Sequence, residues 1–125
     1  MRALAEEPMM MSDLRDLQWQ HRILVVNEPR EADALLDLLS ANEAAFEDRQ
    51  LIWFVLQGKT VKTNYVETID DELVQNIRRQ LAIGLKEVLL IGLDGGVKAR
   101  ENHVDLEALY AMIDAMPMRR AQQRE

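Results

Sequence analysis

Three side chains in this chain could carry out acid–base chemistry together. Glu28 follows the first expected strand, Lys86 precedes the third, and His103 follows the fourth. In the expected topology these positions lie at one end of the sheet, and an imidazole titrates near neutral pH. One hypothesis is therefore a cysteine-independent enzyme that uses these residues. The alternative is that they are solvated loop residues.

Other catalytic and metal-binding chemistries find little support in the residue types. The absence of cysteine excludes thiol–disulfide exchange, peroxidatic thiols, thiolate zinc sites and disulfide bonds. His21, the other histidine, is expected at the opposite end of the first strand, which argues against a shared histidine metal site. The dipole of the helix that follows explains the run Asp70-Asp71-Glu72, and Ser12 and Ser40 do not suggest a hydrolytic triad. We predict no metal and no cofactor.

A β-hairpin is the clearest structural signal in the sequence. Val88–Leu93 is an apolar run of strand length, Asp94-Gly95-Gly96 is a turn signal, and Val97–Arg100 returns as a half-polar strand. Asp-Gly and Gly-Gly tolerate the positive φ that tight turns need. A phosphate-binding loop is not favoured, because the glycines lack the required spacing to a Gly-Lys pair and a strand rather than a helix follows.

The remaining periodicity predicts two further strands and three helices around this hairpin. Ile23–Val26 and Leu51–Leu56 are continuous apolar runs, typical of strands covered on both faces. Helical spacing is expected over Arg30–Asp48 and Asp70–Ile83, and a third helix begins after Asp105 and stops before Pro117. The predicted class is α/β and thioredoxin-like, in the order β-α-β-α-β-β-α, with a four-stranded mixed sheet and helices on both faces.

Composition and length predict one soluble, acidic domain. With 125 residues, 48% hydrophobic and 30% charged, the chain is typical of a globular protein, which we divide into an N-terminal tail (1–16), a domain (17–119) and a C-terminal tail (120–125). Gln57–Glu67 is expected to be a polar connection. The net charge of -7 argues against nucleic acid as a partner, and no apolar run is long enough for a membrane span. Met1–Met11 lacks the apolar core of a signal peptide, which leaves the cellular location open.

Four short motifs recur together in a known family. They are the lead-in Trp19-x-x-Arg22, Arg49 before the second strand, the hairpin I-G-x-D-G-G-x-K at Ile91–Lys98, and M-P-M-R at Met116–Arg119. With these motifs the chain resembles, over Leu17 to Arg119, a bacterial family of unknown function. The resemblance implies a thioredoxin- or peroxiredoxin-like fold and the DUDES group, which also occurs in animal extracellular-matrix proteins. Relatives in this family are often exported to the periplasm.

The motif residues are expected to gather at one end of the predicted sheet. There the first two strands begin, the hairpin turns and the third helix ends. The predicted cluster consists of Trp19, Arg22, Arg49, Asp94, Gly95, Gly96, Lys98, Asp114 and Arg119. We expect Asp94 and Asp114 to pair with some of the three arginines. Such a network either locks the C-terminal tail to the sheet or forms a shallow site for an anion or a peptide carboxylate.

The function predicted from these features is a redox-inactive, thioredoxin-like binding or scaffold module for a protein or peptide partner. The acid–base enzyme described above is the alternative from another class. A homo-oligomer assembled through exposed methionines (Met112, Met116 and Met118) or through an edge strand is a third hypothesis.

Overall fold

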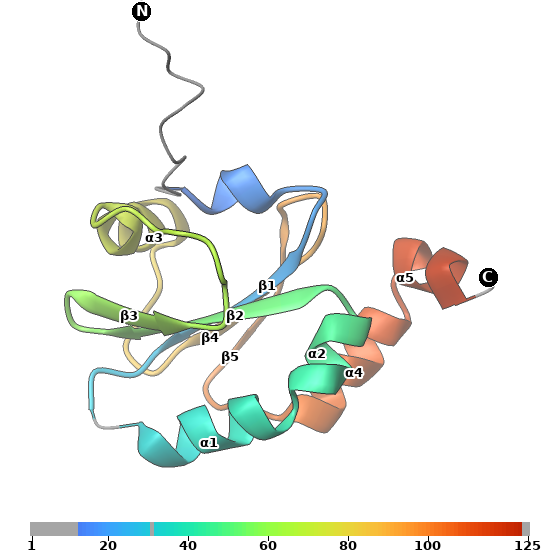
Figure 1. Cartoon of the computed structure of the whole chain (residues 1–125), viewed down its shortest axis with the longest axis horizontal. Coiled ribbons are helices and arrows are strands. Elements are labelled where there is room, and N and C mark those ends of the chain that lie inside the picture. The colour runs from blue at the N-terminus through green and yellow to red at the C-terminus, as the bar shows by residue number, and fades with distance from the viewer. Residues whose placement is uncertain (1–12, 31, 124–125) are drawn as a thin grey trace, which may run out of the picture.

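The protein has a mixed α/β fold built on a five-stranded mixed sheet (Figure 1). The computed structural model describes residues 13–30 and 32–123. The strands are β1 (Arg22–Asn27), β2 (Leu51–Gln57), β3 (Thr60–Thr63), β4 (Val88–Ile91) and β5 (Val97–Glu101). They lie in the order β3-β2-β1-β4-β5; β1 and β2 are parallel and the other neighbours antiparallel.

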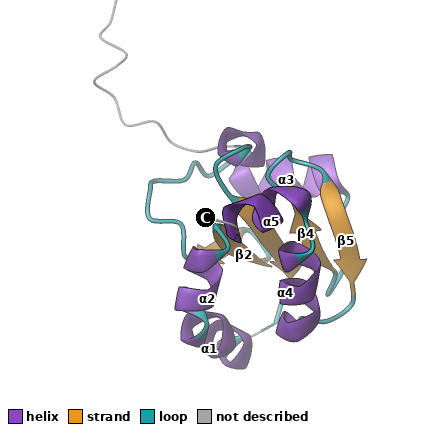
Figure 2. Ribbon diagram, turned by 90° about the vertical axis from the view of Figure 1, so that its right-hand side faces the viewer, coloured by secondary structure: helices purple, strands orange, loops and turns teal. Residues whose placement is uncertain are grey.

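Helices cover both faces of this sheet. They are α1 (Asp33–Ala41), α2 (Glu43–Asp48), α3 (Leu73–Leu81), α4 (Leu106–Asp114) and α5 (Pro117–Gln123), preceded by the 3₁₀ turn η2 (Leu14–Leu17). Figure 1 shows α3 on one side of the sheet and α1, α2 and α4 on the other. Figure 2 shows β5 at the outer edge, next to β4. No helix in the described ranges has the length and apolar character needed to cross a bilayer.

The core is divided into two layers by the alternation of side chains along the strands. Ile23 and Val25 of β1 pack with η2 and α3, whereas Leu24 and Val26 pack with α1, α2 and α4. All six residues of β1 are buried, which confirms a central strand covered on both faces. Phe46 of α2 is fully buried in the second layer.

The sheet has five strands, so the predicted count of four was wrong. The additional strand, β3, lies within the stretch expected to be a polar connection. Gly58, with a φ of 66°, closes the tight turn that brings β3 back along β2, where Val55 pairs with Lys62. Exposed and half-buried residues alternate along β3, so it carries little of the hydrophobic signal by which strands are recognised.

The predicted helix over Arg30–Asp48 is two helices that meet at Asn42. The Asn42 side chain donates to the carbonyl of Leu38 (2.9 Å), and its Oδ1 accepts a hydrogen bond from the hydroxyl of Tyr110 (3.0 Å). An asparagine that bonds the backbone behind it competes with the helical ladder. The break therefore coincides with the polar contacts that Asn42 makes with Leu38 of α1 and with Tyr110 of α4.

Pro117 begins a helix that the sequence pattern did not indicate. The third helix does end near the expected position, at Asp114, but Pro117 is then the first residue of α5. A proline at this position costs no hydrogen bond, because the first N–H groups of a helix have no partner within it. The same residue thus ends one helix and begins the next.

Asp13 fastens η2 to α3. Its carboxylate accepts hydrogen bonds from the backbone N–H of Arg15 (2.9 Å) and from Nε2 of Gln80 (2.8 Å). Burial alone would raise the pKa of Asp13, but the bonds from Arg15 and Gln80 and the charge of Arg15 lower it to about 2, from an ordinary 3.8.

This lowered pKa predicts a loss of stability in acid. Because the folded chain binds the proton of Asp13 less readily than the unfolded chain, the stabilisation is complete above about pH 4 and is lost as the pH falls towards 2. Between pH 4 and pH 2, the free energy of unfolding of the variant Asp13→Asn should therefore fall less than that of the wild type. We expect the difference to be on the order of 1 kcal/mol. Urea unfolding at a series of pH values measures it, and parallel profiles for the two proteins would contradict the expectation.

Candidate functional site

The end of the sheet where β1 and β2 begin holds the predicted cluster in two separate groups. Arg22 opens β1, Arg49 directly follows α2, Asp114 ends α4 and Arg119 lies in α5. These residues form one network. The hairpin residues form a second group, which has its own contacts.

The first group is an arginine–aspartate network that joins three helices. The Asp114 carboxylate accepts bonds from Nε (3.2 Å) and Nη2 (3.0 Å) of Arg49 and from Nε of Arg119 (3.1 Å). Arg119 also donates to the carboxylate of Asp48 (2.6 Å) and to its backbone carbonyl (2.8 Å). Arg49 in turn lies over the ring of Tyr110, 4.2 Å from its centre. The network therefore holds α5 against the ends of α2 and α4.

The charges within this network perturb each other. Burial alone would raise the pKa of Asp114, but the hydrogen bonds and charges of Arg49 and Arg119 lower it overall. Burial alone would lower the pKa of Arg119, and its bonds to Asp48 and Asp114 raise it. Each of these groups is thus held in its charged form by the others.

Arg22 is the exception, because it is fully buried without a carboxylate bonded to it. Its Nη1 donates to the carbonyl of Arg49 (2.7 Å). Nε and Nη2 have no hydrogen-bond partner within the described part of the chain. Burial and the nearby charge of Arg119 lower the pKa of Arg22, while Asp114 raises it. A buried cation of this kind costs stability.

The second group surrounds the β4–β5 turn, and here one expected pairing was wrong. Asp94 does not pair with an arginine; its carboxylate accepts from the N–H of Gly96 (2.9 Å) and from Nζ of Lys98 (2.9 Å). Hydrogen bonds from Gly96 and Lys98 lower the pKa of Asp94. Gly95 has a φ of 85°, which allows the tight turn. The nearby groups of the turn thus satisfy Asp94 locally.

Trp19 lies next to this turn in an unusual conformation. Its φ is 70°, in the left-handed region, and its N–H donates to the carbonyl of Leu93 (2.6 Å). The preceding Gln18 donates from its side chain to the carbonyl of Asp94 (2.8 Å). The Trp19 side chain is 62% exposed. The hairpin therefore braces a backbone that displays a tryptophan to solvent.

Glu28, Lys86 and His103 lie at the opposite end of the sheet, after β1, before β4 and after β5. Lys86 and His103 are exposed, and Glu28 accepts a bond from the N–H of Arg30 (3.3 Å). Among the described residues, no hydrogen bond or ion pair joins any two of these three side chains. None of the three lines any of the three main cavities formed by the described residues. The arrangement gives no support for joint acid–base chemistry.

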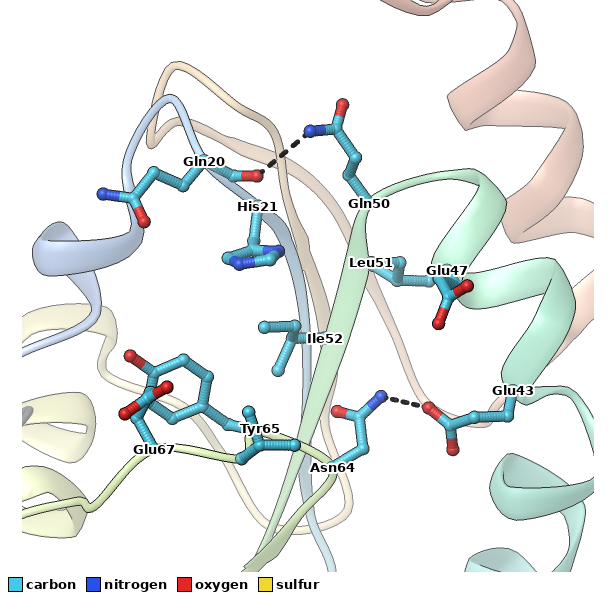
Figure 3. Close-up of a pocket in the computed structure, with 11 residues that line it drawn as sticks. Gln20, His21, Glu43, Glu47, Gln50, Leu51, Ile52, Asn64, Tyr65 and Glu67 are labelled. Carbon is cyan, nitrogen blue, oxygen red and sulfur yellow. Dashed lines mark hydrogen bonds between the residues drawn. The ribbon is translucent and has the colours of Figure 1, made fainter.

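The largest of these cavities is a groove of about 740 Å³ beside the start of β2 (Figure 3). α2 forms one wall and the loop after β3 forms the other. The residues that line this groove are Gln20, His21, Glu43, Glu47, Gln50, Leu51, Ile52, Asn64, Tyr65, Val66 and Glu67. Its volume is in the range of ligand-binding clefts, roughly 300–1,000 Å³.

Hydrogen bonds fix the walls of the groove. Asn64 donates to Glu43 (2.7 Å) and accepts from the backbone N–H of Trp53 (2.9 Å), while Gln50 donates to the carbonyl of Gln20 (3.3 Å) (Figure 3). The sequence reasoning missed this groove. Asn64, in the stretch after the expected second strand, was the one available signal, because an asparagine often bonds the backbone where a strand ends.

His21 lines the groove, and its partial burial favours the neutral form of its ring. Burial lowers its pKa from the ordinary 6.5, and its Nδ1 has no hydrogen-bond partner among the described residues. No group of three or more histidine, aspartate or glutamate side chains in the described ranges is arranged to hold a metal ion.

Comparison with known proteins gives one match. Residues 13–122 match a family model described as "Domain of unknown function (DUF4174)". Neither the curated proteins nor the solved structures contain a protein that matches the chain.

Proposed function

The chain belongs to the family described as "Domain of unknown function (DUF4174)", and from this premise we propose that it is a binding module for a protein or peptide partner. The partner binds at the end of the sheet that displays Trp19. We also propose that the fold is thioredoxin-like, as the parallel β1–β2 unit followed by α3 and the β4–β5 hairpin suggests. The kinship with bacterial and extracellular-matrix proteins of the DUDES group, implied by the motifs, belongs to the same proposal.

The observation that carries this function is the conformation of Trp19. A left-handed backbone costs a residue with a Cβ about 1–2 kcal/mol relative to the right-handed form. A side chain that is 62% exposed recovers little of this by packing. Strained residues that the surrounding structure holds in place are concentrated at binding sites. Tryptophan is also one of the three residue types that are enriched among the energetic centres of protein interfaces.

The test separates the display of the indole from its effect on folding. Asparagine tolerates the left-handed region, so we expect Trp19→Asn to leave the free energy of unfolding unchanged or raised by up to about 1 kcal/mol. The same variant is expected to lose the partner. Chemical denaturation measures the first effect, and affinity capture with the immobilised full chain, quantified by mass spectrometry, measures the second.

Leu85 provides a matched control at the opposite end of the sheet. It is 72% exposed, and it precedes Lys86, whose N–H donates to Asn27 at the end of β1. Leu85→Ala is expected to capture the same partner as the wild type. The proposed function is wrong if Trp19→Asn also captures that partner. Loss of capture with Leu85→Ala alone would move the binding end to Glu28, Lys86 and His103.

A further inference from the structure

Arg22 carries a pair of unpaired hydrogen-bond donors. Its side chain is fully buried, and its Nη1 donates to the carbonyl of Arg49 (2.7 Å). Nε and Nη2 are both buried and have no partner among the described residues. These two atoms form one edge of the planar guanidinium, so their N–H groups point in the same direction. The unpaired donors therefore form a complete bidentate binding edge.

The same edge is occupied in the neighbouring Arg49. Nε and Nη2 of Arg49 donate to Oδ1 and Oδ2 of Asp114, at 3.2 and 3.0 Å. A carboxylate presents two oxygens that match this pair of donors, which makes the contact strong and specific. Arg22 thus lacks the kind of partner that Asp114 supplies to Arg49. A second carboxylate would also offset the repulsion between Arg22 and Arg119.

The position of Arg22 in the fold decides how a carboxylate reaches it. Side chains alternate along β1, so Arg22 lies on the same face as Leu24, which α2 and α4 cover. The bond to the carbonyl of Arg49 places the Arg22 guanidinium at the end of α2. Beyond the ends of α2 and α4 lies α5, whose Arg119 bonds to the last residue of each. We infer that α5 closes this end of the layer over Arg22.

The described part of α5 is held to the body of the protein by the polar contacts of one residue. From Pro117 to Ala121, Arg119 alone is buried, and none of these residues belongs to either layer of the hydrophobic core. One of the two carboxylates that hold Arg119, that of Asp48, is 66% exposed. Water already competes for an exposed carboxylate, so these bonds cost less to break than those of a fully buried pair. α5 can therefore move without disturbing the core.

We propose that Arg22 is the base of a carboxylate-binding site that α5 covers. When α5 moves away, a carboxylate binds to Nε and Nη2 of Arg22, so that docked α5 and ligand compete. A buried water could bond to the same donors, but it would leave the buried charge without a counter-ion. This inference goes beyond the proposed function, because it does not depend on Trp19. Small carboxylates and polypeptide C-termini share the required chemistry.

The test follows the Nε–Hε resonance of Arg22 by nuclear magnetic resonance in the full-length protein. The first probe is sodium acetate, with sodium chloride at equal ionic strength as the control for screening. We expect a saturable shift with acetate but not with chloride, because Nε–H then donates to a carboxylate. Amide resonances of α5 are expected to shift with the same midpoint, because binding displaces that helix.

A second pair of probes tests the source of the carboxylate. Acetylglycine carries the carboxylate of a polypeptide C-terminus, and acetylglycinamide has the same shape without the charge. We expect acetylglycine to bind and its amide to bind at least about tenfold more weakly. Tighter binding of acetylglycine than of acetate would identify a polypeptide C-terminus as the ligand, and equal binding a small carboxylate; both results support the site.

Variants separate the binding edge from its cover. Arg22→Lys keeps the charge but has no bidentate edge, so it should bind acetate at least about tenfold more weakly. Arg119→Ala releases α5 and should bind acetate at least about tenfold more tightly. Asp48→Asn, a milder change at an exposed carboxylate, should tighten binding about threefold and keeps the test valid if Arg119→Ala unfolds. Arg120→Ala, exposed on the same helix, should bind like the wild type.

Three results would overturn the covered site. The first is an Arg22 Nε–Hε resonance that responds equally to acetate and chloride. The second is unchanged affinity in Arg22→Lys, or equal affinity for acetylglycine and its amide. The third is weaker binding by Arg119→Ala and Asp48→Asn, which would mean that the anion contacts α5 instead of competing with it.

Discussion

Replacing Arg119 by alanine is expected to lower the free energy of unfolding by about 2–3 kcal/mol. The Arg119 side chain is only 6% exposed and holds α5 through Asp48 and Asp114. Breaking a fully buried ion pair costs about 3–5 kcal/mol. The carboxylates of Asp48 and Asp114 are 66% and 34% exposed, so water recovers part of that cost when the arginine is removed.

Arg120→Ala is the matched control for this effect. Arg120 is the exposed neighbour of Arg119 on the same helix, and we expect its removal to change stability by less than about 0.5 kcal/mol. Guanidinium denaturation of the two variants and the wild type measures the difference. If Arg119→Ala unfolds at the same guanidinium concentration as the wild type but no longer binds a carboxylate ligand such as acetate, the network is an anion site rather than a structural lock.

Replacing Arg22 by methionine is expected to raise the free energy of unfolding by about 1–2 kcal/mol. The substitution removes a fully buried cation whose Nε and Nη2 lack partners and whose charge is repelled by Arg119. The substitution also removes the one hydrogen bond that Arg22 donates, to the carbonyl of Arg49. Methionine fills a similar volume with a flexible apolar chain. Proteins in which buried ionic groups are replaced by apolar residues of similar volume are often as stable as the original or more stable.

Arg22→Ala separates charge from volume at the same position. Alanine removes the charge but leaves a cavity, so we expect it to be less stable than the methionine variant by about 2 kcal/mol or more. Thermal and urea unfolding of the three proteins rank them. A methionine variant less stable than the wild type by more than 1 kcal/mol would mean that Nε and Nη2 are satisfied in solution, for example by internal water.

Elements with strong local signals were predictable from the sequence. The continuous apolar runs of β1 and β2 are buried on both faces, and the Asp-Gly-Gly turn joins β4 to β5. By contrast, β3 depends on its register with β2, and only Val61 of its residues packs against the core. Its pairing is a tertiary effect, and no hydrophobic pattern in the sequence reports it.

The sites divide in the same way. Topology was sufficient to bring Arg49, Asp114 and Arg119 to one end of the sheet. It could not choose between a distant arginine and Lys98 as the partner of Asp94, because that choice depends on local turn geometry. Apart from Asn64, the groove left no signal in the sequence, because it depends on how α2 and the loop after β3 stand relative to the start of β2.

The central place of β1 has a consequence for the order in which the nascent chain folds. β1 pairs with β2 soon after it, but its other neighbour, β4, leaves the ribosome only after α3. The α1–α2 crossover can therefore assemble with β1 to β3 while the edge of β1 that later pairs with β4 is still unpaired. Long-range pairing of this kind slows folding and exposes intermediates to aggregation. The chain is thus most vulnerable during synthesis between Thr63 and Val88.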